Sequence, residues 1–207
     1  CAGINKRRKA EGKEPFKPIL GCEMYVAHHR LQDKIKENGD NSGYHLIVLA
    51  KNYNGYKNLI KLVSKSWVDG YYYRPRTDRV ELEKYHEDLI VCSACIAGEV
   101  PSKILHGDLA GAREACEWYH RVFGDDYYLE LQRHEVKDPT ILANREAYPL
   151  QQKANKVLLE FAKEYGIKVI CTNDVHFEDK ETAEAHDHLL CLSTGKDLDD
   201  PNRMRYS

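Results

Sequence analysis

Short apolar runs alternate with longer amphipathic segments along most of the chain, and this alternation constrains the fold more than any other feature. The short runs have the length of strands, and we predict strands over Lys17–Ala27, Tyr44–Ala50, Asp88–Ala94, Tyr127–Leu131 and Lys168–Thr172. The longer segments have helical spacing and predict helices over Tyr53–Val68, Gly98–Phe123 (broken around Gly107-Asp108), Tyr148–Tyr165 and Lys180–Cys191. Strands that alternate with helices form βαβ units, so we predict an α/β fold with a mostly parallel sheet.

Three segments lack this periodicity. Asp69–Asp78 and Arg133–Pro149 are polar or rich in turn residues and predict loops. Ser193–Ser207 is typical of a linker that leads into another part of a protein. The helix that ends at Tyr165 is followed by Gly166, the residue type expected just after a helix.

The composition of the 207 residues excludes several classes of protein. The 33 acidic and 31 basic residues give a net charge of −2, which argues against a purely electrostatic nucleic-acid binder. No apolar run approaches the roughly 18 residues that a membrane span needs. The seven cysteines form no regular framework, which favours free thiols in a reducing cytoplasm.

The segment Thr172–His176 carries the densest chemical signal. It follows a predicted strand, and in an extended chain Asp174 and His176 would project to the same side. A carboxylate beside an imidazole is half of a divalent metal site, and such sites are assembled at the carboxyl ends of parallel strands. The alternative is that Asp174 caps the next turn and His176 is an exposed loop residue.

Three further side chains are candidates for the same site. Glu23 lies within an apolar strand, where a buried carboxylate would need a cation, a donor or solvent. His45 begins the next strand, although such a histidine is more often a surface or hydrogen-bonded residue. Cys92 and Cys95 form a CxxC without a second pair, so we interpret Cys92 as core and Cys95 as a thiol available beside Asp174 and His176.

The loop that contains Arg74 and Arg76 follows three tyrosines, Tyr71–Tyr73. Guanidinium groups beside aromatic rings can bind phosphate or stack on bases. An exposed tyrosine-rich loop over the core explains the same residues equally well.

Four segments together resemble a known family. Gly21–Val26, Tyr44–Ala50, Ser93–Val100 and Thr172–His176 occur in the order in which similar motifs occur in the polymerase-and-histidinol-phosphatase (PHP) domain of bacterial replicative DNA polymerase III alpha subunits. The segment from His188 to Arg203 is similar to that family's connection to the polymerase body. The resemblance covers nearly the whole chain.

The resemblance implies a distorted (β/α)7 barrel with up to nine metal ligands at its strand ends. By residue match, Glu23, His45, Cys95, Asp174 and His176 fall on ligand positions, and His134 is a weaker candidate. In related phosphoesterases two or three metals activate water on a phosphate ester. Nitrogen, oxygen and sulfur donors would accept zinc, manganese or iron.

The chain also departs from the family pattern. It has no opening His-x-His motif, no following aspartate and no Thr-Asp-His, and it begins at Cys1. We therefore expect that the first strand and its crossover are missing, that 1–192 form an incomplete PHP barrel and that 193–207 begin the linker into the polymerase palm. We assign no catalytic residue, and we expect weak or absent metal binding and no polymerase activity from this chain alone.

The resemblance implies a role in DNA replication through the parent DNA-directed DNA polymerase. Its partners would be DNA and replisome subunits, including a proofreading exonuclease, with no membrane. The PHP domain would act as a 3′–5′ exonuclease-like phosphoesterase or as a scaffold. Two alternatives stay open: a free-standing metal-dependent phosphoesterase and a non-catalytic interaction module.

Overall fold

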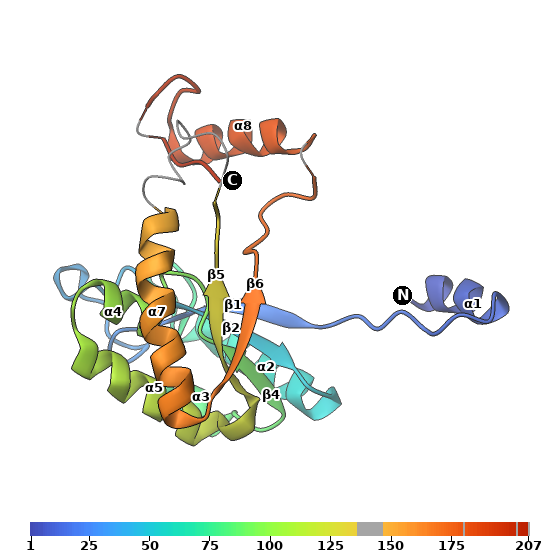
Figure 1. The fold of residues 1–207 in the computed structure, drawn as a ribbon, viewed down its shortest axis with the longest axis horizontal. Helices are drawn as coiled ribbons and strands as arrows, with labels where there is room; N and C mark the ends of the chain where they lie inside the picture. The colour runs from blue at the N-terminus through green and yellow to red at the C-terminus, as the bar shows by residue number, and fades with distance from the viewer. Residues whose placement is uncertain (136–146, 180, 202, 207) are drawn as a thin grey trace. The chain divides into compact units, whose positions relative to one another are not determined.

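A computed structural model describes residues 1–135, 147–179, 181–201 and 203–206 (Figure 1). The chain divides into two compact units, one of residues 1–43 with 47–91 and the other of 44–46 with 92–207. The strands are β1 Gly21–Val26, β2 Tyr44–Ala50, β3 Arg76–Thr77, β4 Leu89–Cys92, β5 Tyr127–Gln132 and β6 Lys168–Thr172. The α-helices are α1 Ala2–Ala10, α2 Tyr53–Val68, α3 Arg79–Lys84, α4 Glu99–Leu105, α5 Leu109–Phe123, α7 Ala147–Tyr165 and α8 Ala183–Thr194, and the 3-10 turns are η1 Lys36–Asn38 and η2 Gly124–Asp126.

The strands pair in the order β3-β1-β2-β4-β5-β6. β1 pairs with β3, and β5 with β6, in parallel; Leu129 of β5 lies opposite Val169 of β6. The predicted α/β class is confirmed, and all five predicted strands are present. β3 was not predicted, because two residues are too few to show a period.

Unit 1 is organised by the helix that follows β2. The Asn52 side chain accepts hydrogen bonds from the backbone N–H groups of Asn54 and Gly55, so α2 begins at the predicted residue. Gly55 is required here, because a Cβ at this position would collide with the carbonyl oxygen of Asp88. The face of α2 that is buried consists of small and polar residues as well as leucine: Gly55, Asn58, Leu59, Leu62 and Ser66. Most of the helix's aromatic residues therefore lie on its other face.

In unit 2, α4, α5 and α7 pack around β5. The predicted break falls at Gly107 and Asp108, where Gly107 has a φ of +83° and the Asp108 side chain accepts a hydrogen bond from the Gly111 N–H. Tyr119 of α5 stacks on Tyr127 at the start of β5, with 5.4 Å between ring centroids, and both rings are buried. The helix α7 lies along β5 and β6 (Figure 1) and ends at Tyr165, followed by Gly166 with a φ of +68°.

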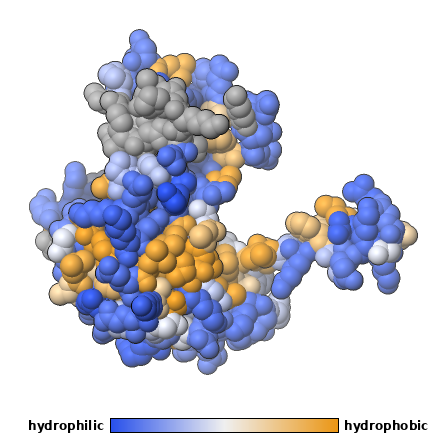
Figure 2. Space-filling model, in the orientation of Figure 1, coloured by the Kyte–Doolittle hydropathy of each residue, from blue (hydrophilic) through white to orange (hydrophobic). Residues whose placement is uncertain are grey.

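Strand β6 is the least covered part of this sheet. Although its sequence is apolar, Lys168 and Cys171 are exposed and the other three residues are only half-buried. Apolar side chains gather over β6 in the space-filling view (Figure 2). A cavity of about 500 Å³ beside it is lined by residues of β5, β6 and α7, among them Leu131, Leu159 and Cys171.

The segment after α8 contains one buried arginine, and its assignment as a linker stays a prediction. The helix extends to Thr194, and Arg203 is buried beside it. Nη2 of Arg203 donates to the Asp187 carboxylate at 2.7 Å, and its Nε donates to the Leu198 carbonyl at 2.8 Å. The ion pair lowers the pKa of Asp187. The burial of Arg203 could not be predicted from the sequence, because a single buried arginine does not change the hydrophobic periodicity of the segment.

Two other predictions need adjustment. The loop predicted over Arg133–Pro149 contains residues 136–146, which lie outside the described residues, and its last three residues begin α7. The short helices α1 and α3 were not predicted. Among the described residues, no helix is both long and apolar enough to cross a membrane.

Candidate functional site

The chain turns sharply at the end of β4. Ser93 and Ala94 are buried, and Ala94 has a φ of +61°, a conformation that costs a non-glycine residue about 1 kcal/mol or more. Its N–H donates to Oε2 of Glu130 at 3.1 Å, which holds the turn in place. Cys95 follows directly, beyond the strand end as predicted, whereas Cys92 is buried in the strand.

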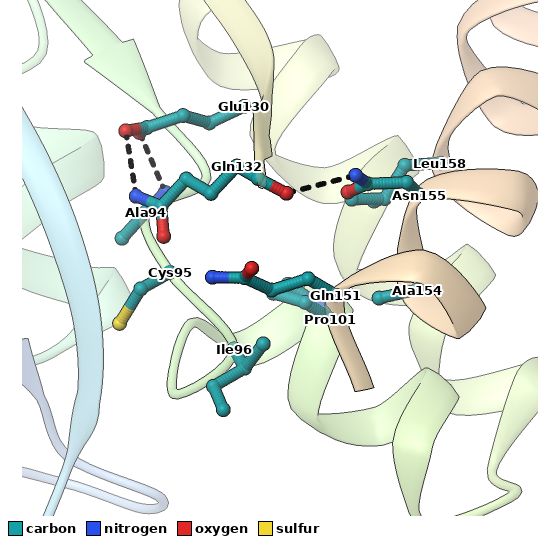
Figure 3. A pocket seen from close by; sticks show the side chains of 10 residues that line it. All are labelled: Ala94, Cys95, Ile96, Pro101, Glu130, Gln132, Gln151, Ala154, Asn155 and Leu158. Carbon is teal, nitrogen blue, oxygen red and sulfur yellow. Dashed lines mark hydrogen bonds between the residues drawn. The ribbon is translucent and has the colours of Figure 1, made fainter. Parts of the chain in front are cut away.

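Glu130 of β5 is bonded to the turn after β4 and to Gln132 (Figure 3), and also to Thr172 of β6. Its side chain is only 6% exposed, and its Oε1 accepts from the Gln132 amide at 3.2 Å and from the Thr172 hydroxyl. Its backbone N–H donates to the Ser93 Oγ at 2.8 Å. A buried carboxylate is tolerated where donors surround it, and here the donors come from the turn after β4, from β5 and from β6. Burial, with a smaller contribution from Glu130, also raises the pKa of Cys92 to about 12.

Sequence reasoning missed Glu130 as a site residue. The signal was present, because Glu130 is an acidic residue inside the apolar strand β5, the same pattern that singled out Glu23. Glu23 itself is exposed at the start of β1, so the desolvation argument that drew attention to it does not apply.

His45 and Cys95 lie side by side. The distance from His45 Nδ1 to Cys95 Sγ is 3.6 Å, and the His45 N–H donates to the Ala97 carbonyl at 3.0 Å. Both side chains are half-buried. A cavity of about 10 Å³, room for about one water molecule, adjoins Cys95 and is lined in part by Glu130 and Gln132 (Figure 3). Two of the predicted ligands are thus adjacent.

The segment after β6 is arranged differently from the extended chain considered above. Asp174 has a φ of +49°, so the strand does not continue and the simple alternation of side chains is lost. Nδ1 of His176 donates to the backbone carbonyl of Asp174 at 2.6 Å, which places the imidazole lone pair on Nε2. The Tyr206 ring stacks on the His176 ring at 3.7 Å between centroids.

His134 is anchored through both ring nitrogens. Nε2 donates to the Asn173 carbonyl at 2.8 Å, and Nδ1 accepts from the Gln151 amide at 2.9 Å. The His134 N–H in turn donates to the Gln151 Oε1 at 2.8 Å. His134 therefore positions the loop after β6 in this structure and has no lone pair directed at a metal. It shares a cavity of about 350 Å³ with Asp174, His176 and Tyr206.

The two predicted phosphate-binding arginines differ. Arg76 is fully buried, and its guanidinium donates to the carbonyl oxygens of Gly70, Leu31 and Asp33, so it is inaccessible to a phosphate in this structure. The prediction for Arg76 is corrected for this reason. Arg74 lies at the surface, where it donates to the Tyr25 hydroxyl at 2.6 Å.

The described residues contain no group of three or more His, Cys, Asp or Glu side chains arranged to hold a metal ion. A zinc site takes three or four protein ligands, and the pairs present here fall short of that number. We therefore derive no chemical step through a metal. Glu23 belongs to the other unit, so the convergence of all five predicted ligands stays a prediction.

The family model for the PHP domain matches residues 3–134 of the chain. The chain belongs to the PHP domain family. This PHP chain is also similar to proteins named DNA polymerase III subunit alpha. It is 41% identical over 203 residues to the protein of Borreliella burgdorferi, covering 98% of the chain and 17% of that protein.

Other relatives show the same relation. The Treponema pallidum protein is 38% identical over 200 residues, and the Thermus aquaticus protein 39% over 191 residues. The alignments cover 96% and 92% of the PHP chain but only 16% and 15% of those proteins. The chain thus spans about a sixth of the length of the relatives it matches.

Proposed function

We propose that this PHP chain is a segment of a DNA polymerase III alpha subunit and acts in DNA replication through that subunit. The observation that carries the proposal is the similarity to proteins of that name over 92–98% of the chain. DNA and replisome subunits are then the proposed partners, and the cytoplasm is the proposed compartment. A free-standing phosphoesterase would have no reason to align with a polymerase subunit through its last helix.

Within this role we propose that the chain alone is a scaffold rather than a nuclease. The two-metal mechanism of phosphate-ester hydrolysis needs two ions about 3.5–4 Å apart, each with its own ligands. His45 and Cys95 offer one pair of donor atoms, whereas Asp174 and His176 only line the same cavity. Weak binding of zinc, manganese or iron at the His45–Cys95 pair is the expected remnant of a larger family site.

We further propose that the fold is a PHP barrel whose sheet is completed by a strand outside these residues. Strand β6 supports this, because it is the last strand in the sheet order and its apolar surface is only partly covered. A strand placed along β6 would cover Cys171 and fill the cavity beside Leu159.

The test combines metal analysis with a nuclease assay. The purified chain is dialysed against zinc or manganese, its metal content is measured, and release of a mismatched 3′ nucleotide is followed. We expect less than one metal per chain, lowered further by Cys95→Ala, and no turnover. Tightly held stoichiometric metal, or turnover that Asp174→Ala abolishes, would show a competent centre and overturn the scaffold role.

A further inference from the structure

Helix α2 exposes all three of its aromatic residues instead of burying them. Tyr53, Tyr56, Ile60 and Trp67 are 71%, 37%, 45% and 58% exposed. Their spacing of 3, 4 and 7 residues places them along one side of the helix, opposite the buried face. We call these four residues the α2 stripe. At 1.5 Å per residue the stripe extends over roughly 21 Å.

The rings of the α2 stripe are arranged as a stacking surface. Tyr53 and Tyr56 have ring centroids 6.4 Å apart. At the other end, Trp67 stacks on Tyr71, which is itself exposed, at 5.6 Å and 17° between ring planes. Flat rings stack on bases irrespective of their sequence. Because tyrosine and tryptophan are also common in protein–protein interfaces, the neighbouring charges decide between the two kinds of partner.

The charged residues of helix α2 itself are all positive. Residues 53–68 contain three lysines and no aspartate or glutamate, although the whole chain carries a net charge of −2. Lys57 Nζ lies 4.7 Å from the centre of the Tyr53 ring, and Lys61 Nζ lies 5.4 Å from that of Tyr85. The third, Lys65, is paired with Asp69 at 2.8 Å. Lys57, which lies over a ring of the stripe, and Lys61, one helical turn further on, are therefore the cations that this helix offers.

We propose that the α2 stripe, with Lys57 and Lys61 beside it, binds single-stranded DNA. The lysines would contact backbone phosphates while unpaired bases stack on the exposed rings, the combination by which proteins bind single strands without sequence preference. The choice of DNA over RNA rests on the proposed function. The arguments from ring stacking and from charge are independent of the proposed function. The surface lies wholly within unit 1, whereas His45 and Cys95 belong to unit 2.

Fluorescence anisotropy of labelled (dT)20, titrated with the full chain at several salt concentrations, tests the proposal. Stacking contributes about 1–3 kcal/mol per base, so Tyr53→Ala with Trp67→Ala should weaken binding at least about 10-fold. Tyr53→Phe with Trp67→Phe, which keeps the rings, should retain most of the affinity. Lys57→Gln with Lys61→Gln should lower the slope of log K against log salt by about 1.4, since each phosphate contact to a single strand contributes about 0.7.

Matched controls come from the exposed segment before β1. Phe16→Ala and Lys17→Gln remove an aromatic ring and a positive charge from the same unit but outside α2, and should leave affinity unchanged. Circular dichroism confirms that every variant is folded.

Three outcomes would overturn the proposal. These are no binding of (dT)20, equal loss of affinity in the controls, and equal or tighter binding of (rU)20, which would assign the surface to RNA. Metal content reports on His45 and Cys95 in the other unit, so the proposed function and this inference can fail independently.

Discussion

The turn after β4 and the turn after β6 each contain a residue with a left-handed backbone conformation, but their surroundings differ. Ala94 and Asp174 both have left-handed φ values, of +61° and +49°. Ala94 is buried and its N–H is bonded to a buried carboxylate, whereas Asp174 is half-buried and its neighbours Val175 and His176 are exposed. The first turn is fixed by interactions within unit 2. The second turn lies at the surface, next to a strand whose residues are all exposed or half-buried.

Thiol reactivity should show the largest difference between these two regions. Burial raises the pKa of Cys92 in β4 from about 9.0 to about 12, while Cys171 in β6 is exposed. Three pKa units leave ~1000-fold less thiolate, and the thiolate is the form that reacts. At pH 8 we expect Cys92 to be alkylated much more slowly than the exposed Cys171, as measured by peptide mass spectrometry.

Cys116 provides an internal check, because burial raises its pKa to about 12 as well. In denaturant all three cysteines should react at similar rates. Comparable rates for Cys92 and Cys171 in the native protein would mean that the end of β4 is as open as the end of β6.

The next largest expected effect is on stability. Removal of the Glu130 carboxylate should lower the free energy of unfolding by about 3 kcal/mol. Glu130→Ala leaves the Ala94 N–H, the Gln132 amide and the Thr172 hydroxyl without their buried acceptor. Urea unfolding followed by circular dichroism measures the loss. Glu178→Ala, an exposed carboxylate in the loop after β6, serves as the control and should change stability little. A loss no larger than the control's would remove Glu130 from the role of connecting the strands.

The fold was largely predictable from sequence because its elements are set by local patterns. The apolar period gave β2, β6 and α2 to the residue, and Gly166 marked the end of α7. Which face of α2 is buried was not predictable. The inward face includes Gly55, where the backbone of Asp88 leaves no room for a Cβ, while the more apolar Tyr56 and Trp67 lie at the surface.

The site was predictable only in part, because its contacts join residues far apart in the chain. The proximity of His45 to Cys95, 50 residues away, required the pairing of strands as well as the family resemblance. Arg76 illustrates the limit. An arginine beside tyrosines suggests phosphate binding, yet this side chain is buried and its Nε and Nη2 donate to the backbone carbonyls of Gly70, Leu31 and Asp33. Spacing alone does not show whether a guanidinium faces solvent or the interior.

The smallest expected effect concerns Thr172. This residue of β6 forms hydrogen bonds with the buried side chains of Glu130 and Gln132. Its hydroxyl donates to Glu130 Oε1 and lies 3.3 Å from the Gln132 amide nitrogen. Thr172→Val keeps the shape and removes the hydroxyl, and should cost about 1 kcal/mol in urea unfolding. Thr172→Ser keeps the hydroxyl and should cost less.

Hydrogen exchange then separates the two turns. In Thr172→Val the Ala94 amide should stay protected, because Glu130 Oε2 still accepts from it, while amides after β6 should exchange faster than in the unmodified protein. Equal deprotection of both turns would mean that Glu130 is held in place by Thr172 rather than by its other donors. In that case the order of the β4 turn, and with it the approach of Cys95 to His45, would depend on the exposed strand.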